Sequence, residues 1–519
     1  MNAVVHAANH GRSLPPSRRD LGFYIDGALY TAGHRETMDR VAPGYGQVVS
    51  RVTLCTAEDV DRAVIAARGA FVRGDWSHRA GRERSAVLNR AAALIRQRRE
   101  ELAYWETLES GKPISQSLAE MEGAADEFEQ GAAAARTLHG DTFNNLGDDL
   151  FGVVMREPIG VVALITPWNF PLIVLAERLP YILASGNSVV VKPSEFTSAT
   201  TLMMADLLAE AGLPRGVYNV VTGLGPGVGE ALSAHPDIDM ISFTGSQRAG
   251  TSVMTLATGN FKKVSLEMGG KNPQIVFADA DLDDAADGVA FGLCYNAGQC
   301  CVSGSRLIIE AGVAEDFQAR LIDKLRHVRT GECLDPEVQL GAIFTPAHRD
   351  KIMGYIGAGT KAGATLALGG ELLRISSGDY VAPTLLTHTT NRMDVVRNEV
   401  FGPVLCQMTF HGEAEAHDLA NDSPYGLAAS IWTKDIDKAL RLMRTVNGGR
   451  MWINTTISGG PELPKGGMKQ SGMGREGGLM GTEEYTEVKA AHIAIGKRHP
   501  WVKADVASTV AAAQDRTVP

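Results

Sequence analysis

Two adjacent cysteines, Cys300 and Cys301, lie in the stretch NAGQCCVSGSR of residues 296–306. A cysteine thiolate is a strong nucleophile that can attack an electrophilic carbon and form a covalent intermediate. An unperturbed thiol has a pKa of about 8.5, so only about 3 per cent is ionised at pH 7 and a catalytic cysteine needs local activation. A free cysteine is more often a small buried hydrophobe. The stretch alone does not decide between these roles.

A glutamate precedes Cys301 by 34 residues, in the stretch VSLEMGGKNP. Glu267 stands just before the pair Gly269-Gly270, a poor position for a simple surface acid and a good one for a carboxylate near a substrate. A partly desolvated glutamate has a raised pKa and can act as a general base near neutral pH. Glu267 is therefore a candidate base.

An asparagine follows the first strand of the predicted parallel sheet, in ITPWNFPLIVLAERL. Asn169 is flanked by Pro167 and Pro171, which stiffen the loop and prevent a helix before residue 171. Ligands of open parallel sheets bind beyond the carboxyl ends of the strands, so the Asn169 amide is a candidate oxyanion donor. The alternative is an asparagine that only forms the turn.

The next strand end carries charges, in VVVKPSE. In a dinucleotide-binding fold, an acid after the second strand accepts hydrogen bonds from ribose hydroxyls, and Glu195, beside Lys192, is placed for that role. Its carboxylate would repel a 2′-phosphate, which favours NAD over NADP. Glycine-rich turns follow two later strands, where helix N-termini can bind a pyrophosphate. The alternative is a solvated loop with ordinary charges.

Composition and missing motifs exclude several classes of function. The formal net charge of −10 argues against a nucleic-acid partner, because phosphate binding needs a basic surface. No apolar run reaches the about 18 residues that span a bilayer, so we expect no membrane partner. The G-x-S-x-G, H-E-x-x-H and paired C-x-x-C motifs are absent, and we expect no metal. Six irregularly spaced cysteines favour a reducing compartment, here the cytoplasm, over a disulfide framework.

The order of predicted elements indicates an α/β fold. A chain of 519 residues is too long to form a single hydrophobic core and should form two or three domains. Thr56 is a predicted helix N-cap, a second helix is predicted over about 82–104, and residues 113–138 continue helical. From about residue 159 apolar strands alternate with helices, and a second series begins near residue 273. This alternation predicts two doubly wound parallel sheets.

The N-terminal segment contains Arg12, Arg18 and Arg19, and residues 1–19 contain no acid. This composition weakly resembles a transit peptide, but two prolines interrupt it and no amphipathic period is visible. We therefore expect residues 1–20 to be a disordered tail.

Seven motifs occur in order along the chain: TPWNFP, VKPSE, FTGS, LEMGGKNP, GQCC, EVFGPV and LPKGGMKQSGMGRE. Together they resemble the NAD(P)-dependent aldehyde dehydrogenase superfamily, and the resemblance extends from about residue 21 to residue 495. One motif would be weak evidence, but seven in family order are specific. The resemblance implies a Rossmann-like cofactor domain, a catalytic domain and a β oligomerisation arm.

The resemblance assigns the catalytic residues. The family's nucleophile lies two residues after the glutamine of G-Q-x-C, which selects Cys301 and leaves Cys300 as a pocket-lining or oxidation-sensitive neighbour. Asn169 resembles the oxyanion donor and Glu267 the general base. The implied reaction oxidises an aldehyde to the carboxylic acid through a thiohemiacetal and a thioester. Glu267 favours hydrolysis over transfer to coenzyme A; an acylating enzyme and a non-catalytic binding protein are the alternatives.

The resemblance implies NAD as the cofactor, with NADP as the alternative. Lys192 and Glu195 resemble ligands of the adenine ribose, and Glu399 and Phe401 resemble residues that hold the nicotinamide ribose and ring. Further expected contacts are Thr166, Pro167, Trp168, Ser194, Gly225, Gly229, Phe243, the turn Gly245-Ser246 near the pyrophosphate, Met268 and Gly269.

The resemblance also sets the expected domains. They are an NAD-binding domain over 21–140 and 160–267, a catalytic domain over 268–480, an oligomerisation arm over 141–159 and 481–498, and a C-terminal extension over 499–519. Such an arm implies a homodimer or a homotetramer.

The substrate pocket departs from the family pattern. The family commonly has an aromatic residue six positions after Pro171, where this chain has Glu177 followed by Arg178, and Ala134 is small where aromatics are frequent. With Phe170 as a further pocket residue, a roomier tunnel with one carboxylate suggests a cationic aminoaldehyde or betaine aldehyde. Alternatively, the residue 177–178 neighbourhood forms structural ion pairs, and the substrate is a neutral aliphatic, aromatic or semialdehyde.

Overall fold

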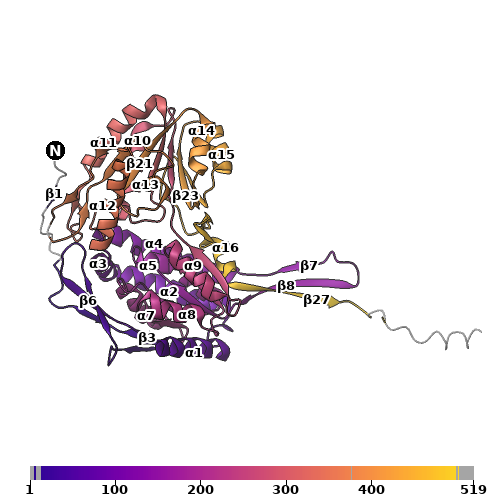
Figure 1. Ribbon diagram of the computed structural model, residues 1–519. Helices are drawn as coiled ribbons and strands as arrows, with labels where there is room; N and C mark the ends of the chain where they lie inside the picture. The colour runs from indigo at the N-terminus through magenta and orange to yellow at the C-terminus, as the bar shows by residue number, and fades with distance from the viewer. Residues whose placement is uncertain (1–4, 7–12, 376, 498–500, 502–519) are drawn as a thin grey trace, which may run out of the picture. The chain divides into compact units, whose positions relative to one another are not determined.

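The computed structural model describes residues 5–6, 13–375, 377–497 and 501. The chain divides into two units: Met1–Leu138 with Pro158–Tyr485, and His139–Glu157 with Thr486–Pro519. The larger unit contains two large sheets with helices, and the smaller contains a three-stranded sheet (Figure 1). The predicted α/β class is confirmed.

The first large sheet has eight strands. Their order is β26 (Gly472–Met473), β13 (Lys263–Glu267), β12 (Met240–Thr244), β9 (Val161–Ile165), β10 (Ser188–Lys192), β11 (Tyr218–Val220), β3 (Phe23–Ile25) and β4 (Ala28–Tyr30). The five strands from β13 to β11 are parallel. Alternate residues of β9 belong to two different hydrophobic cores, Val162 and Leu164 to one and Val161 and Ala163 to the other. Because both faces are apolar, helices cover both, as a doubly wound sheet requires.

Helices of the larger unit supply those two cores. One core contains residues of α2 (Gly81–Gln97), α3 (Arg99–Ser110), α4 (Ile114–Thr137), α5 (Pro171–Ala176), α6 (Leu179–Ala184) and α7 (Ala199–Ala211). The other contains residues of α1 (Ala57–Arg73), α8 (Glu230–Ala234) and α9 (Gln247–Ala257). A short irregular helix, η1 (Gly225–Gly229), precedes α8.

The second large sheet has seven strands and a third core. Their order is β17 (Thr365–Leu368), β20 (Thr384–Thr387), β21 (Val404–Phe410), β15 (Arg306–Glu310), β14 (Pro273–Val276), β23 (Ala428–Trp432) and β24 (Arg450–Ile453). All neighbours are parallel except β17 and β20. The helices of this region are α10 (Leu282–Cys294), η2 (Tyr295–Gly298), η3 (Ala311–Val313), α11 (Ala314–Arg326), α12 (Pro346–Lys361), α13 (Asp394–Arg397), α14 (Glu413–Asn421) and α15 (Ile436–Thr445).

Small sheets complete the larger unit. They pair β1 (Val5–His6) with β16 (Thr330–Gly331), β2 (Arg19–Leu21) with β6 (Val48–Thr53) and β5 (Thr37–Val41), β18 (Leu372–Leu373) with β19 (Tyr380–Val381), and β22 (Tyr425–Gly426) with β25 (Met468–Lys469). The expected tail of residues 1–20 lies partly outside the described residues, and its last two residues belong to β2.

The predicted N-cap at Thr56 is confirmed, and one predicted helix is wrong. Thr56 caps α1, since its hydroxyl accepts from the Asp59 N–H while the Asp59 carboxylate accepts from the Thr56 N–H. The single helix predicted over 82–104 is wrong, because Arg98, with φ −104° and ψ 16°, leaves the helical region and separates α2 from α3. A second unpredicted break, at Arg178 with φ −130°, separates α5 from α6.

The smaller unit is a sheet in the order β27 (Thr486–Ala494), β8 (Leu150–Pro158) and β7 (Asp141–Phe143). It contains most of the two segments expected to form the oligomerisation arm. Residues 481–485 instead belong to the larger unit, where α16 (Gly478–Glu484) contains most of them. The C-terminal extension, residue 501 excepted, lies outside the described residues.

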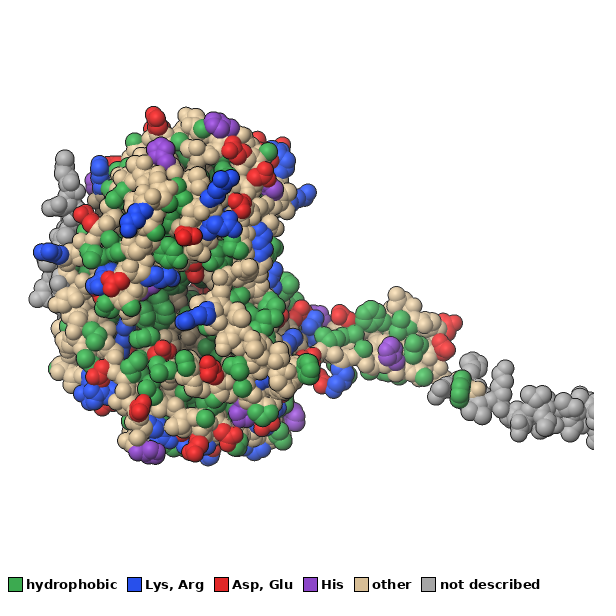
Figure 2. Space-filling view, in the orientation of Figure 1, with side chains coloured by type: hydrophobic (Ala, Val, Ile, Leu, Met, Phe, Trp, Pro, Cys, Tyr) green, Lys and Arg blue, Asp and Glu red, His purple; other side chains and the backbone are tan. Residues whose placement is uncertain are grey.

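Acidic and basic side chains are interspersed over the face drawn in Figure 2, and no large basic patch is visible on it. Within the described ranges, no helix is both long and apolar enough to span a bilayer.

Candidate active site

The loop that carries the two cysteines has a rare backbone conformation. Between α10 and β15, Asn296, Ala297 and Gly298 have consecutive positive φ angles of 48°, 54° and 70°. A Cβ at Gly298 would lie 2.3 Å from the carbonyl carbon of Gly402 and 2.7 Å from the nitrogen of Pro403. Only glycine fits this position, so the first residue of the G-Q-x-C motif sets the path of the loop.

Gln299 holds the loop in place. Its side chain is fully buried. The Oε1 atom accepts the N–H of Phe344 at 2.9 Å, and Nε2 donates to the carbonyl of Asn296 at 3.1 Å. The glutamine of the motif is therefore a structural anchor, a role that the sequence does not reveal.

Asn169 lies against this loop. It follows β9 by four residues and precedes α5 by two, and its Nδ2 donates to the carbonyl of Gln299 at 3.0 Å. In return, Nδ2 of Asn296 donates to the carbonyl of Asn169 at 2.9 Å. The structure thus brings the predicted oxyanion donor to the predicted nucleophile loop. An amide carries two N–H donors, so one is committed to Gln299 and one can serve a ligand.

Asn272 fixes the chain after the nucleophile. Its Nδ2 donates to the carbonyls of Cys301, at 2.8 Å, and Ser303, at 2.9 Å. Its Oδ1 accepts the N–H of Ala428 at 3.0 Å. This asparagine lies in LEMGGKNP, and its position inside a family motif was the only signal that could have found it.

Glu267 and Cys301 line one cavity of about 390 Å³, together with Phe170 and Glu177. Glu267 is the last residue of β13, and its Oε1 accepts the N–H of Gly467 at 2.8 Å. Burial raises the pKa of Glu267 to about 7, against the opposing effect of the nearby positive charge of Arg178. A carboxylate with this pKa is partly ionised at neutral pH and can accept a proton.

The thiols of Cys300 and Cys301 differ in their exposure to solvent. Cys300 is buried, whereas Cys301 is more accessible. A hydrogen bond with Cys300, together with burial and the negative charge of Glu267, raises the pKa of Cys301. Its thiol is therefore protonated at rest and needs a base, and Glu267 lines the same cavity.

Glu177 and Arg178 both form ion pairs. Glu177 contacts Lys465 at 2.5 Å, and Glu127 contacts the same ammonium at 2.7 Å. Arg178 pairs with Glu476. The structure thus shows ion pairs at both Glu177 and Arg178, as expected if this neighbourhood forms structural ion pairs, and Lys465 and Glu476 lie far along the chain from them.

Ala134, expected to widen the tunnel, is buried and is not among the cavity-lining residues.

The expected cofactor residues gather where the parallel strands end. Four strands are followed by such residues: β9 by Thr166, Pro167 and Trp168, β10 by Ser194 and Glu195, β12 by Gly245 and Ser246, and β13 by Met268 and Gly269. Two more lie within strands, Lys192 in β10 and Phe243 in β12. Because carboxyl ends of parallel strands share one edge, these residues converge there.

Other expected cofactor residues lie close to the residues at these strand ends. A Cβ at Gly229 would lie 3.6 Å from the Lys192 side chain, which itself lies 3.6 Å from Glu195. Glu399 accepts the N–H of Gly270 at 3.1 Å and leaves no room for a Cβ at Gly269. The ring of Phe401 lies 5.6 Å from that of Trp168.

This region fits a dinucleotide. The space beside Gly225 is open. The buried Thr166 hydroxyl has no hydrogen-bond partner among the described residues, so a polar ligand could satisfy it. Glu195 and Glu399 supply carboxylate acceptors for ribose hydroxyls, and burial raises the pKa of Glu399 to about 7. Among the described residues no cluster of side chains could hold a metal ion.

The Aldehyde dehydrogenase family model matches residues 30–491. The chain belongs to the aldehyde dehydrogenase family. It is 40% identical over 469 residues to a betaine aldehyde dehydrogenase of Bacillus subtilis (strain 168), covering 90% of this chain and 96% of the relative.

Solved structures agree with this assignment. An NAD-dependent aldehyde dehydrogenase of Sinorhizobium meliloti has a TM-score of 0.92 and 47% identity, over 94% of this chain and 97% of that one. An indole-3-acetaldehyde dehydrogenase of P. syringae, solved with NAD+ and IAA, has a TM-score of 0.90 and 40% identity, over 92% and 98%.

We expect Gly298→Ala to lower the rate of aldehyde oxidation at least tenfold, because the added Cβ meets backbone atoms and the φ of 70° disfavours alanine. Gly312→Ala is the matched control, since its Cβ meets no atom within 4 Å and its φ is not positive. Steady-state rates of the two variants check this, and an active Gly298→Ala enzyme would contradict it.

We expect hydrolysis of the Cys301 acyl-enzyme to rise with pH through about 7, because Glu267 must be ionised to take a proton from water. The enzyme is acylated with p-nitrophenyl acetate and deacylation is followed from pH 5.5 to 8.5. In Glu267→Gln the rate should fall at least about 100-fold and lose this pH dependence. An unchanged profile in the variant would show that another group is the base.

Proposed function

We propose that this aldehyde dehydrogenase acts on an aldehyde that carries a positive charge. The supporting observation is the charge of the cavity wall that leads to Cys301, which has two basic side chains, Arg450 and Lys465. It has six acidic ones: Glu120, Asp126 and Glu476, which pair with Lys112, Arg96 and Arg178 outside the wall, and Glu127, Glu177 and Glu267, which have no such outside partner among the described residues. An excess of carboxylates in a cavity of low dielectric stabilises a cationic ligand.

The ion pairs within this wall leave one carboxyl group over. Glu127 and Glu177 share the single ammonium of Lys465, so this group has one carboxyl group more than it has ammonium groups. Burial and the charge of Glu177 raise the pKa of Glu127, and a cationic ligand would favour its ionised form. An aldehyde with a quaternary or primary ammonium group would be such a ligand. The similarity to a betaine aldehyde dehydrogenase supports the same substrate class.

The proposed reaction uses Cys301, Asn169 and Glu267. Glu267 takes the thiol proton, and the sulfur of Cys301 adds to the aldehyde carbon. The Asn169 amide and the Cys301 N–H hold the resulting oxyanion, a contribution typically worth about 100-fold or more in rate per donor. NAD, when bound, supplies the acceptor for the hydride that leaves this carbon. Once Glu267 has released its proton to solvent, it takes one from water, whose oxygen attacks the thioester and releases the acid and the thiol.

Glu267 also supports release of the free acid over transfer to coenzyme A, because a buried base with a pKa of about 7 can activate water.

We propose NAD as the oxidant, held at the strand ends by Trp168, Lys192, Glu195, Glu399 and Phe401. The carboxylate of Glu195, part-exposed beside Lys192, would repel a 2′-phosphate and so supports NAD over NADP.

A neutral aromatic aldehyde is the second candidate. The rings of Phe170 and Tyr295, both in the cavity wall, stack with centroids 5.7 Å apart, and such a surface can hold an apolar substrate. The P. syringae relative, named for indole-3-acetaldehyde, supports this candidate.

We further propose that the chain forms a homodimer or homotetramer through the sheet of β7, β8 and β27, an element too small to bury a core of its own.

We propose a reducing compartment, the cytoplasm, because all six cysteines are free and Cys301 must remain a thiol.

The substrate proposal predicts that wild type prefers betaine aldehyde to 3,3-dimethylbutanal, its neutral isostere, in kcat/KM. Glu177→Gln should lower this preference about five- to tenfold, since one carboxylate charge near the cation is worth on the order of 1 kcal/mol. Asp126→Asn is the control, because Asp126 lines the same cavity but is exposed and paired with Arg96 at 2.6 Å, so the preference should stay. A preference unchanged in Glu177→Gln would overturn the cationic substrate.

A further inference from the structure

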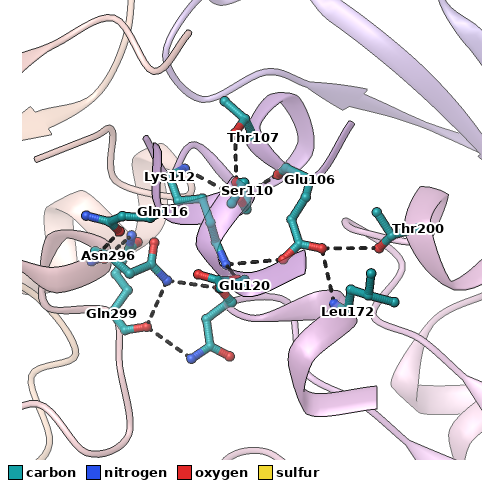
Figure 3. Close-up of polar contacts among 12 residues, drawn as sticks. Glu106, Thr107, Ser110, Lys112, Gln116, Glu120, Leu172, Thr200, Asn296 and Gln299 are labelled. Atoms are coloured by element: carbon teal, nitrogen blue, oxygen red, sulfur yellow. Dashed lines mark hydrogen bonds and ion pairs between the residues drawn. The ribbon is translucent and has the colours of Figure 1, made fainter. Parts of the chain in front are cut away.

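A charged cluster lies buried behind the active site, where α3 joins α4. The side chains of Lys112, Glu106 and Glu120 are 0%, 0% and 4% exposed. The ammonium of Lys112 lies 3.3 Å from Oε1 of Glu106 and also pairs with the carboxylate of Glu120 (Figure 3). We call these three residues the Lys112 cluster. Buried charges are costly, so their contacts bear on what the cluster does.

Glu106 connects the cluster to the loop of Asn169. Its Oε2 accepts the N–H of Leu172, in the first turn of α5, at 3.1 Å, and the hydroxyl of Thr200 at 3.4 Å (Figure 3). First-turn N–H groups have no partner within a helix, and the helix dipole favours a negative charge there. Asn169 lies three residues before Leu172, so Glu106 fixes the end of the loop that carries it.

Lys112 and Glu120 reach the same loop from its other side. The Lys112 ammonium lies 4.3 Å from the ring centroid of Phe170, the residue after Asn169. That ring stacks on Tyr295, whose hydroxyl donates to Oε1 of Glu120 at 3.4 Å. The cluster thus holds the residue after Asn169 and the residue before Asn296, the two asparagines that are hydrogen-bonded to each other.

We propose that the Lys112 cluster is a positioning group for the Asn169 amide. Lys112 and Glu106 act through Phe170 and Leu172, since neither lines the cavity. The inference rests on the proposed roles of Asn169 and Cys301. Displacement of a catalytic group by about 1 Å can cost about 100-fold in rate, so a cluster remote from the reacting atoms can control the rate.

Two reactions of Cys301 separate positioning from general damage. Acylation by p-nitrophenyl acetate passes through a tetrahedral oxyanion and releases p-nitrophenolate, whereas alkylation by iodoacetamide displaces iodide and forms no oxyanion. In Lys112→Met we expect acylation to fall at least 30-fold and alkylation to stay within threefold of wild type. An equal fall in both reactions, or no fall in acylation, would overturn the proposal.

The double variant Lys112→Met/Glu120→Gln removes one ammonium and one carboxyl group, so the formal net charge of the cluster stays as in wild type. Its acylation should remain low, and recovery to the wild-type rate would overturn the proposal in favour of charge balance alone.

Glu109→Gln is the matched control on α3. Glu109 is buried and accepts the N–H of Ala199 at 3.0 Å, at the start of α7 and not of α5, so both reactions should persist. Loss of acylation alone in this control would also overturn the proposal. Both reactions should vanish in Cys301→Ser, and their persistence there would instead overturn the proposed function.

Discussion

The carbonyl oxygen of Gln299 accepts hydrogen bonds from two side-chain amides, those of Asn169 at 3.0 Å and Asn296 at 3.2 Å. Asn169 follows a strand of the eight-stranded sheet, and Gln299 lies in the loop that leads into the seven-stranded sheet. This single backbone atom therefore joins the two α/β regions at the point where the chemistry is proposed. The positive φ angles of the loop, which glycine alone tolerates at residue 298, are what present that carbonyl to both amides.

Burial is the second constraint on the site. It raises the pKa of Glu267 and of Glu399 to about 7, so both can change protonation near neutral pH. Elsewhere in the same region, charges are buried in groups in which carboxylates outnumber ammonium groups, at Lys465 and at Lys112. Desolvation of these charges costs free energy of folding, and the strong, directional contacts that the charges form fix several loops.

The parts of the molecule that depend on neighbouring residues could be predicted from the sequence. The cap at Thr56 involves residues three apart, and the apolar strands of the parallel sheets have a distinctive pattern. The family resemblance of the seven motifs pointed to Cys301, Glu267 and Asn169 as the residues proposed for catalysis. The break at Arg98 has no glycine or proline to mark it, whereas the break at Arg178 is marked by Pro180, in the first turn of α6, and was overlooked.

Long-range contacts could not be predicted. Glu177 and Lys465 are 288 residues apart, and no local pattern joins a cavity carboxylate to an ammonium so far away. The anchors Gln299 and Asn272 act on backbone groups of distant segments, and the Lys112 cluster combines residues of two helices with a third helix that begins 34 residues after α4 ends. Such contacts depend on how the elements pack in three dimensions.

Cys301, and not its neighbour Cys300, is the residue that we propose forms the covalent bond to the substrate. Mass spectrometry of the enzyme with Glu267 intact, quenched in acid during turnover with NAD and an aldehyde, tests this assignment, because the quench traps the thioester. We expect an acyl group on the peptide of residues 296–306, present when Cys300 is replaced by alanine and absent when Cys301 is replaced by alanine. An acyl group that persists without Cys301, or that requires Cys300, would contradict it.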